Sequence, residues 1–249
     1  MPMKLLDDDE CHIWWADAQE FPAEALRADL SATEIIRASR YRSPAARRQF
    51  VTACWLLRTM AARQLGLAPA EVQLDRRCPD CGRPHGKPQI LGTRRPLHAS
   101  VSHSGGRVAV ALCPAVPIGV DVEAVRDVPV AEAALAAAEL AALRSLPMRE
   151  HRAGFARAWV RKEAALKATG HGLRIPPDKV IVSVAEEPAE LLDWPLDLPS
   201  RSVRLHTLAP GYGYIGAIAL LDESRSVRVS ESDATRLCSS YAEEFTVAA

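Results

Sequence analysis

Two acidic side chains near the middle of the chain are the first candidates for chemistry. Asp121 and Glu123 lie in the segment Ile118-Gly-Val-Asp-Val-Glu, whose apolar residues predict a strand. Residues two apart on a strand leave the same face, and neighbouring carboxylates repel each other unless a cation lies between them. Oxygen ligands of this kind suit Mg²⁺. An isolated D-x-E pair is more often the solvated face of an edge strand, so the pattern nominates a metal site without establishing it.

Glu163 and Lys167 form a second candidate pair, on a helix predicted over residues 150–169. The motif Trp159-Val-Arg-Lys-Glu-Ala-Ala-Leu-Lys places the two charges four residues apart on one flank of that helix. The plain interpretation is a surface ion pair worth about 0.2–0.5 kcal/mol. The alternative is a carboxylate and an ammonium that act together on a bound substrate.

Lys162 lies in the apolar arc of the same helix, with Phe155, Trp159 and Leu166. A cation is costly to bury without a partner. Its stem could lie along the apolar surface while the ammonium stays in water. The sharper alternative is a phosphate partner, which makes Lys162 a candidate for binding a phosphorylated ligand.

His103 lies between Ser102 and Ser104, at a turn between two predicted strands where small residues would let a phosphate approach. A single histidine in such a place is more often structural than functional. Adjacent residues of a strand point to opposite faces, so Ser102 and His103 cannot form the nucleophile–base pair of a hydrolase.

Basic residues near two predicted turns complete the candidates for anion binding. Arg40 and Arg48 flank the start of a helix predicted from Ser43, where cations oppose the helix dipole unless an anion is bound. The turn Gly86-Lys87-Pro88 carries a lysine. Each feature alone is typical of solvated surface.

Cys78, Cys81 and His85 are three ligands of the type that Zn²⁺ uses, in the segment Cys-Pro-Asp-Cys-Gly-Arg-Pro-His. A closed structural site needs a fourth ligand, and none is near in the sequence; His98 or Cys113 would have to come from elsewhere in the fold. Two reduced thiols are therefore favoured over a structural zinc site. A zinc-loop interaction protein is a rival interpretation that rests on these three residues alone.

The elements that must position these side chains predict an α+β protein in two lobes. Helices are predicted from Ser43-Pro44 to Gly66 and over 130–146 and 150–169, and strands over 97–102, 107–113, 118–122, 180–184, 203–208 and 214–221. A break at Pro114–Pro117 divides an N-terminal lobe, 1–117, from a C-terminal lobe, 118–222, which carries the metal and catalytic motifs. Residues 223–249 are expected to be a partly ordered tail with a strand stub.

Composition excludes several classes of protein. The 249 residues include 31 basic and 31 acidic side chains, and this balance argues against a general role on nucleic acids or membrane surfaces. No apolar run approaches the ~20 residues of a spanning helix. The acidic segment Asp7–Glu10 does not fit a secretory signal. The cysteines are scattered apart from one C-x-x-C, so a reducing cytoplasm is expected.

Taken together, the motifs resemble the 4′-phosphopantetheinyl transferases, specifically their larger two-lobed (surfactin-type) class. The family pattern is G-[IV]-D, followed about forty residues later by [FW]-x-x-K-E-[SA]-x-x-K. This sequence has Gly119-Val-Asp and the nine-residue motif that starts at Trp159. The family's G-K-P and S-H-S motifs are present in the expected order, at 86–88 and 102–104. The resemblance runs from about Arg40 to Leu173 and, less specifically, to Leu221.

The resemblance implies a role for each matching position. Asp121, Glu123 and Glu163 would be the magnesium site, Glu163 would also be the base or the holder of a water, and Lys167 would lie near the leaving group. The expected contacts to coenzyme A are Arg40, Arg48, Gly86, Lys87, Pro88, Ser102, His103 and Lys162.

The fold implied is a pseudo-dimer of two similar α/β lobes, with coenzyme A in the cleft between them. The activity implied is transfer of the 4′-phosphopantetheine arm of coenzyme A to a serine of an apo acyl or peptidyl carrier protein of polyketide, nonribosomal-peptide or fatty-acid synthesis. The reaction would depend on magnesium and release adenosine 3′,5′-bisphosphate. We expect a monomer, with a carrier docking patch on the helix predicted over 130–146. The main alternative is a non-catalytic coenzyme A- or nucleotide-binding regulator on the same fold, for which Glu163 and Lys167 would be dispensable.

Overall fold

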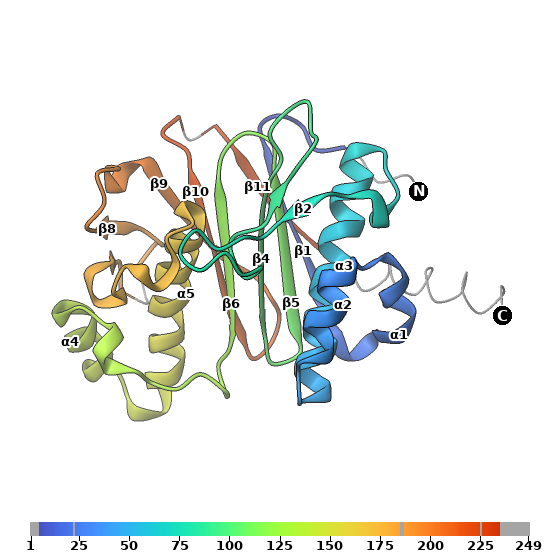
Figure 1. Cartoon of the computed structure of the whole chain (residues 1–249). Helices are drawn as coiled ribbons and strands as arrows, with labels where there is room; N and C mark the ends of the chain where they lie inside the picture. The colour runs from blue at the N-terminus through green and yellow to red at the C-terminus, as the bar shows by residue number, and fades with distance from the viewer. Residues whose placement is uncertain (1–4, 22, 185–186, 225, 235–249) are drawn as a thin grey trace.

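Two β-sheets that share an apolar core form the centre of the protein (Figure 1). The computed structural model describes residues 5–21, 23–184, 187–224 and 226–234. The larger sheet has the strand order β11 (Arg228–Asp233), β1 (Glu10–Asp17), β5 (Arg107–Cys113), β4 (His98–Ser104), β3 (Gln89–Ile90) and β2 (Leu74–Asp75). The smaller sheets are β6 (Ile118–Ala124), β10 (Tyr214–Leu221) and β9 (Val203–Leu208), and the pair β7 (Ile181–Val182) and β8 (Leu191–Asp193). The predicted α+β class is confirmed.

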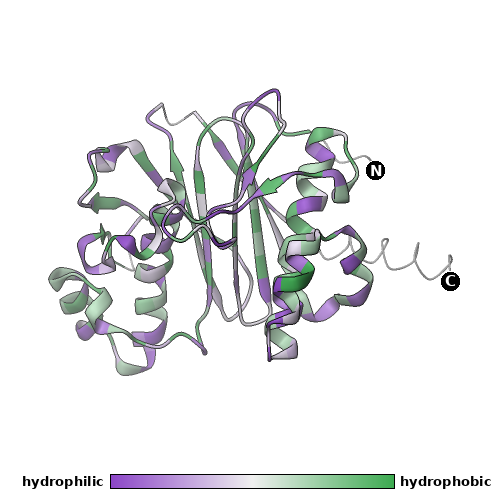
Figure 2. Cartoon of the chain, viewed as in Figure 1, coloured by the Kyte–Doolittle hydropathy of each residue, from purple (hydrophilic) through white to green (hydrophobic). Residues whose placement is uncertain are grey.

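Helices cover the outer sides of the six-stranded sheet and of the three-stranded sheet β6-β10-β9. They are α1 (Ala23–Leu26), α2 (Ala32–Ser39), α3 (Pro44–Leu65), α4 (Ala137–Ser145) and α5 (His151–Thr169). Figure 1 shows α3 on one side of the central strands and α5 on the other. Figure 2 shows hydrophobic stretches along the central strands, whereas the flanking helices carry both hydrophobic and hydrophilic residues. No helix in the described part of the chain is long and apolar enough to cross a bilayer.

The side-chain alternation of β1 explains the layers. Trp14 and Ala16 pack in the core beneath α3, whereas Ile13 and Trp15 pack in the core shared with β6 and β10. Successive side chains of a strand leave opposite faces, so β1 is buried on both. The protein therefore has four layers, with a helix, two sheets and a helix in turn.

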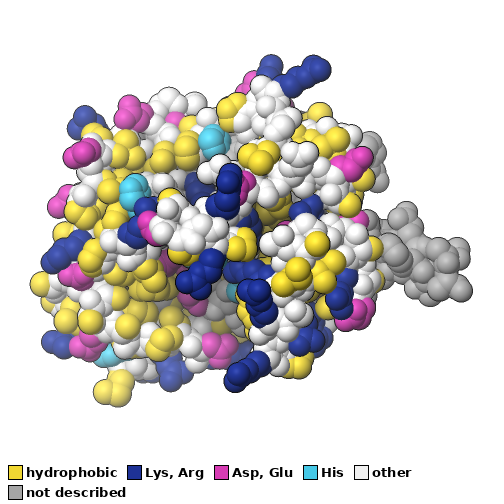
Figure 3. Space-filling view, in the orientation of Figure 1, with side chains coloured by type: hydrophobic (Ala, Val, Ile, Leu, Met, Phe, Trp, Pro, Cys, Tyr) yellow, Lys and Arg dark blue, Asp and Glu magenta, His cyan; other side chains and the backbone are white. Residues whose placement is uncertain are grey.

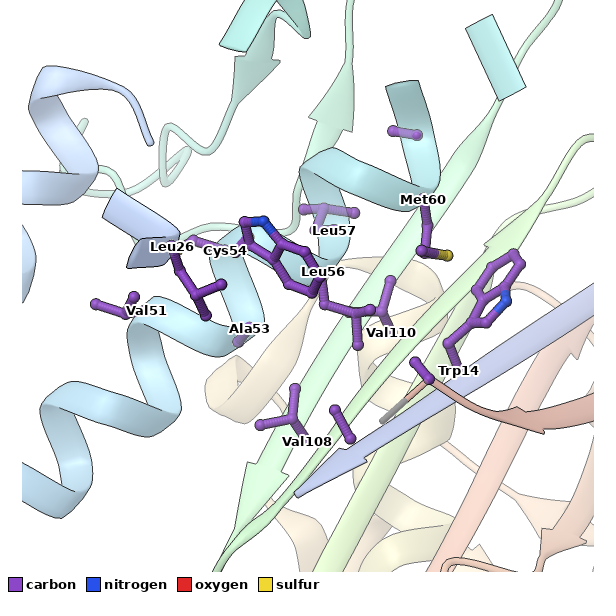
Figure 4. Close-up of a cluster of buried hydrophobic side chains, with 14 of the residues drawn as sticks. Trp14, Leu26, Val51, Ala53, Cys54, Leu56, Leu57, Met60, Val108 and Val110 are labelled. Atoms are coloured by element: carbon purple, nitrogen blue, oxygen red, sulfur yellow. The ribbon is translucent and has the colours of Figure 1, made fainter. Parts of the chain in front are cut away.

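The long helix α3 forms as its sequence predicts. Ser43 caps its start by accepting a hydrogen bond from the Ala46 N–H, Pro44 occupies its first turn, and Gly66 ends it with a φ of 67°. Its inner face is fully buried; Figure 4 shows Leu56 and Met60 beside Val110 of β5. This packing holds α3 against the larger sheet.

Gly119 lets α5 lie directly on β6. A Cβ atom at this position would lie 2.1 Å from the carbonyl oxygen of Ala164 and 2.3 Å from the backbone nitrogen of Ala168. Any side chain would therefore push helix and strand apart. The close contact brings the α5 motif over the acidic residues that follow Gly119.

Three serines of β4 join the two sheets. The hydroxyls of Ser100, Ser102 and Ser104 accept hydrogen bonds from alternate backbone N–H groups of β6, at 2.9, 3.4 and 3.1 Å. The bonds satisfy one edge of β6, whose other edge pairs with β10. Ser102 and Ser104 also donate to Asp121 and Glu123, which ties the S-H-S motif to the acidic strand.

The structure shortens one predicted helix. The helix predicted over 130–146 is a 3-10 turn, Glu132–Ala134, followed by α4 from Ala137 to Ser145. Leu135 is extended and 7% exposed, so burial of its side chain interrupts the helix. The carboxylate of Glu139 then caps α4 by accepting the Ala136 N–H at 2.7 Å.

The strand expected after Asp222 is confirmed as β11. It pairs in parallel with β1, so the chain returns to the larger sheet after completing the smaller one. The rest of the predicted tail, residues 235–249, lies outside the described residues. A division of the chain near residue 117 stays a prediction, to which the structure adds that β11 belongs with the N-terminal strands.

Candidate active site

A cavity of about 310 Å³ lies where β4, β6 and α5 meet. Its acidic lining residues are Asp121, Glu123 and Glu163, and its basic ones are Arg37, Arg76, His103 and Lys167. Figure 3 shows lysine and arginine side chains gathered around a hollow in the middle of this face. The predicted acidic pair on the strand and the predicted Glu–Lys pair on the helix therefore line the same space.

Asp121 is the most buried of the three acids, with 3% of its surface exposed. Its Oδ1 accepts hydrogen bonds from Lys167 Nζ at 2.6 Å and from the Ser102 hydroxyl at 2.8 Å. Lys167 also donates to the Ser102 hydroxyl, at 3.0 Å. The other oxygen, Oδ2, is buried and has no hydrogen-bond partner.

Glu163 and Glu123 lie in surroundings that disfavour their charged forms. Burial raises the pKa of Glu163; Lys167 opposes this shift, and the nearby Asp121 and Glu123 add to it. Burial also raises the pKa of Glu123, although the Ser104 hydroxyl donates to its carboxylate at 2.7 Å. Oε1 of Glu163 is buried without a hydrogen-bond partner. A bound cation or a proton would therefore stabilise the carboxyl groups of Glu123 and Glu163.

The acidic set has the chemistry of a divalent-metal site. Mg²⁺ is bound by one or two carboxylates together with water and phosphate oxygens, and Asp121 and Glu163 each hold a buried oxygen without a partner. The three carboxylates are not clustered as tightly as a closed metal site. Among the described residues, only Cys78, Cys81 and His85 bring three ligand atoms within 4.8 Å of one another. Lys167 supplies the positive charge beside Asp121 instead.

His103 lines the cavity beside the acidic set. Burial within the cavity wall and the charge of Lys167 lower its pKa, which favours the neutral imidazole. The Ser102 hydroxyl is bonded to Asp121 and Lys167 rather than to His103. The two residues therefore do not act as a hydrolase pair.

Lys162 does not bind a phosphate, so this prediction is wrong. Its side chain is fully buried, and its ammonium lies 2.6 Å from the Glu139 carboxylate. It also donates to the carbonyl oxygens of Pro177 and Val180, at 2.8 and 2.7 Å. These partners offset the cost of burial, so Lys162 is a structural residue of the second half of the chain.

The basic residues expected from the first helix lie outside the acidic cavity. Arg40 is exposed and lines a separate cavity of about 420 Å³ together with Arg37 and His85. Arg48 is half-buried on α3 and is not part of either lining. Neither residue contacts the three acids.

The Gly86-Lys87-Pro88 turn contacts the end of α5. The ammonium of Lys87 donates to the carbonyl oxygen of Ala168 at 2.6 Å, and burial lowers its pKa to about 8. A Cβ atom on Gly86 would lie 2.7 Å from the carbonyl oxygen of Arg77, so only glycine fits. Pro88 is buried beside it. The turn therefore bridges the two halves next to the cavity.

Two arginines of the cavity had no signal in the sequence. Arg37 of α2 lies over the Phe50 ring, 4.8 Å from its centroid, and donates to the Pro84 carbonyl at 2.7 Å. Arg76 follows β2, and burial lowers its pKa. Trp159, placed by the sequence in the apolar arc of α5, packs against the core there, stacks on Phe155 and also lines the cavity. Arg37 and Arg76 thus add two cations to the lining of the acidic cavity.

Comparisons with known proteins agree with this arrangement. A model of the 4′-phosphopantetheinyl transferase superfamily matches residues 117–219, which include the three acids and Lys167. The chain is 34% identical over 199 residues to the 4′-phosphopantetheinyl transferase HetI of Nostoc sp., covering 76% of this chain and 81% of the relative. It is 31% identical over 130 residues to the 4′-phosphopantetheinyl transferase psf-1 of Bacillus pumilus, covering 51% of this chain and 55% of the relative.

Proposed function

The chain belongs to the 4′-phosphopantetheinyl transferase superfamily, and from this premise we propose that the cavity where β4, β6 and α5 meet is an active site. In this site the phosphopantetheine arm of coenzyme A is transferred to a serine of an apo carrier protein. The serine hydroxyl attacks the β-phosphate, and adenosine 3′,5′-bisphosphate leaves. One observation carries the proposal: three carboxylates and Lys167 line the same cavity as two arginines and a histidine. Phosphoryl transfer depends mainly on positioning and charge neutralisation, which such a cavity supplies.

The acids fit a magnesium ion. Asp121, Glu123 and Glu163 would hold it, and the partnerless oxygens of Asp121 and Glu163 support this assignment. When bound, the ion would draw charge from the pyrophosphate of coenzyme A. The hydroxyls of Ser102 and Ser104 on β4 donate hydrogen bonds to Asp121 and Glu123 and so hold both carboxylates in place.

Glu163 is the proposed base. A carboxylate whose pKa is raised by burial is a stronger base than an exposed one, and the direction of the Glu163 shift supports this role. It would take the proton of the carrier serine directly or through one water. Its position one helical turn before Lys167 puts acceptor and cation on one face of α5.

Cations of the cavity would bind the phosphates. Lys167 is 28% exposed and has an anion beside it, so it can also contact the oxygen of the departing phosphate. Arg37 and Arg76 offer the planar, bidentate donors that suit phosphate groups. Neutral His103 can donate one hydrogen bond to the same ligand.

The remaining parts of the proposal concern the carrier protein, the oligomeric state and the cellular location. The carrier is an acyl or peptidyl carrier of polyketide, nonribosomal-peptide or fatty-acid synthesis, the enzyme acts as a monomer, and α4 is part of the docking face. A cytoplasmic location is also proposed, because the cysteines of the sequence are scattered apart from one C-x-x-C. A non-catalytic coenzyme A-binding regulator is disfavoured because it would not need Glu163 and Lys167 in the cavity.

Mass spectrometry of an apo carrier tests the proposal. The purified protein is mixed with the carrier, coenzyme A and Mg²⁺, and we expect the carrier to gain the mass of one phosphopantetheine group on its serine. A carrier Ser→Ala variant is the control and should gain nothing. Coenzyme A binding without any mass gain on several carriers would support the regulator instead.

A further inference from the structure

The loop between β2 and β3 gathers three soft metal ligands outside the acidic cavity. The Cys81 sulfur lies 2.9 Å from Nε2 of His85, and the ligand atoms of Cys78, Cys81 and His85 all lie within 4.8 Å of one another. The sequence alone favours two reduced thiols because it offers no fourth ligand. The structure adds that the three side chains already converge.

The backbone of this loop is folded into a tight turn that puts both thiols on one side. The Gly82 N–H donates to the Cys78 carbonyl and the Cys78 N–H to the Arg83 carbonyl, each at 2.9 Å. Gly82 has a φ of 68°, a left-handed conformation that other residues adopt only with strain. The ligands would therefore need little rearrangement to take up an ion.

We propose that Cys78, Cys81 and His85 bind a Zn²⁺ ion whose fourth ligand is water. Thiolate sulfur and imidazole nitrogen are the ligands that zinc prefers, in tetrahedral geometry. Two thiolates balance the charge of the ion, and binding releases the protons of both thiols to solvent. Cys81 and His85 are exposed, which leaves room for the water. Neither His98 nor Cys113 belongs to the group.

The ion would hold a segment that reaches the active cavity. The base of the loop is closed by the Gly86 N–H, which donates to the Arg76 carbonyl at 2.7 Å. Arg76 lines the acidic cavity, and Lys87 is bonded to the end of α5. A zinc ion at the tip of the loop would stiffen the segment between these two residues.

Zinc content of the untagged full-length protein tests the site. The protein is purified under reducing conditions, incubated with Zn²⁺, desalted and analysed for metal. We expect about one zinc per chain, falling to background in Cys78→Ser and Cys81→Ser. Arg83→Ala is the matched control, because it removes an exposed side chain of the same loop and keeps all three ligands. A wild type without zinc, or cysteine variants that keep it, would overturn the proposal.

Two further measurements keep the test decisive if a cysteine variant does not fold. Cobalt substitution of the wild type should give the charge-transfer absorption of cobalt–thiolate bonds. Trypsin should cut the chain after Arg77 faster once a chelator has removed zinc, and re-addition of Zn²⁺ should restore protection. Absent thiolate bands, or cleavage that does not respond to zinc, would count against the site whether or not the protein transfers phosphopantetheine.

Discussion

The ammonium of Lys167 lies 2.6 Å from Oδ1 of Asp121, and this contact joins helix α5 to strand β6 across the floor of the cavity. The two elements approach closely because Gly119 has no side chain to separate them. The same aspartate has a second oxygen that is buried and unbonded. The cavity therefore keeps a cation beside its acids and still offers an oxygen to another ion.

Glu163→Gln should lower the turnover number at least tenfold, because the amide cannot accept the proton of the carrier serine. Coenzyme A should bind as before, since its phosphates are expected to contact Arg37 and Arg76 rather than Glu163. Transfer is followed by mass spectrometry and binding by calorimetry. Glu150→Gln, at the start of the same helix, is the control and should keep full activity. A fully active Glu163→Gln would remove this residue from the mechanism.

The stability of the metal-free protein should depend on pH through Glu163. Burial raises the pKa of this group above its ordinary value of 4.5. Between pH 4.5 and the raised pKa, the folded protein therefore holds a proton that the unfolded chain has lost. The contribution of Glu163 to the stability of the folded protein is therefore fully present below pH 4.5 and is lost as the pH rises through the raised pKa.

The comparison with Glu163→Gln isolates this effect, because the amide never ionises. In the presence of a chelator, we expect the melting temperature of the variant to exceed that of the wild type near neutral pH. The gap should close as the pH falls toward 4.5. A gap that stays constant or widens on acidification would show that burial does not govern this carboxyl group.

Lys162→Met should destabilise the fold rather than weaken coenzyme A binding. It would leave the Glu139 carboxylate buried without its cation, which costs about 3–5 kcal/mol. The double variant Lys162→Met/Glu139→Gln should recover part of the loss. Urea denaturation gives the free energies, and the KM for coenzyme A is measured in parallel. A stable single variant with a raised KM would restore Lys162 as a phosphate ligand.

Gly119→Ala should reduce stability and activity together. The added methyl group would meet the Ala164 carbonyl at 2.1 Å, so α5 must move away from β6. Overpacking of this kind costs about 1–3 kcal/mol or more. The shift would also carry Glu163 and Lys167 away from Asp121. Unfolding in urea and transfer kinetics check both effects, and a variant as stable and active as the wild type would contradict the close packing.

Local sequence rules predicted the parts of the site that lie on single elements. The spacing of Asp121 and Glu123 on a strand, and of Glu163 and Lys167 on a helix, is fixed by backbone geometry alone. The caps of α3 at Ser43 and Gly66 follow from side-chain chemistry in the same way. These features need no knowledge of the tertiary fold.

Contacts between distant segments were beyond such rules. Lys162 was misread because its partner, Glu139, lies on another helix. Arg37 and Arg76 reach the cavity only through the packing of α2 and β2 beside α3, and neither belongs to a motif. Strand β1 was missed because it lies between two cores, so the alternation of polar and apolar residues that marks a half-buried strand is absent.

The most direct test of the account is a magnesium titration of carrier modification. Wild-type protein and Asp121→Ala are compared by the mass of the carrier formed from coenzyme A, with Asp127→Ala, on an exposed turn after β6, as control. We predict that the wild type and Asp127→Ala form phosphopantetheinylated carrier in proportion to added Mg²⁺ until saturation, whereas Asp121→Ala loses this response. An unchanged titration in Asp121→Ala would mean that the acidic cavity between β6 and α5 is not where the metal acts.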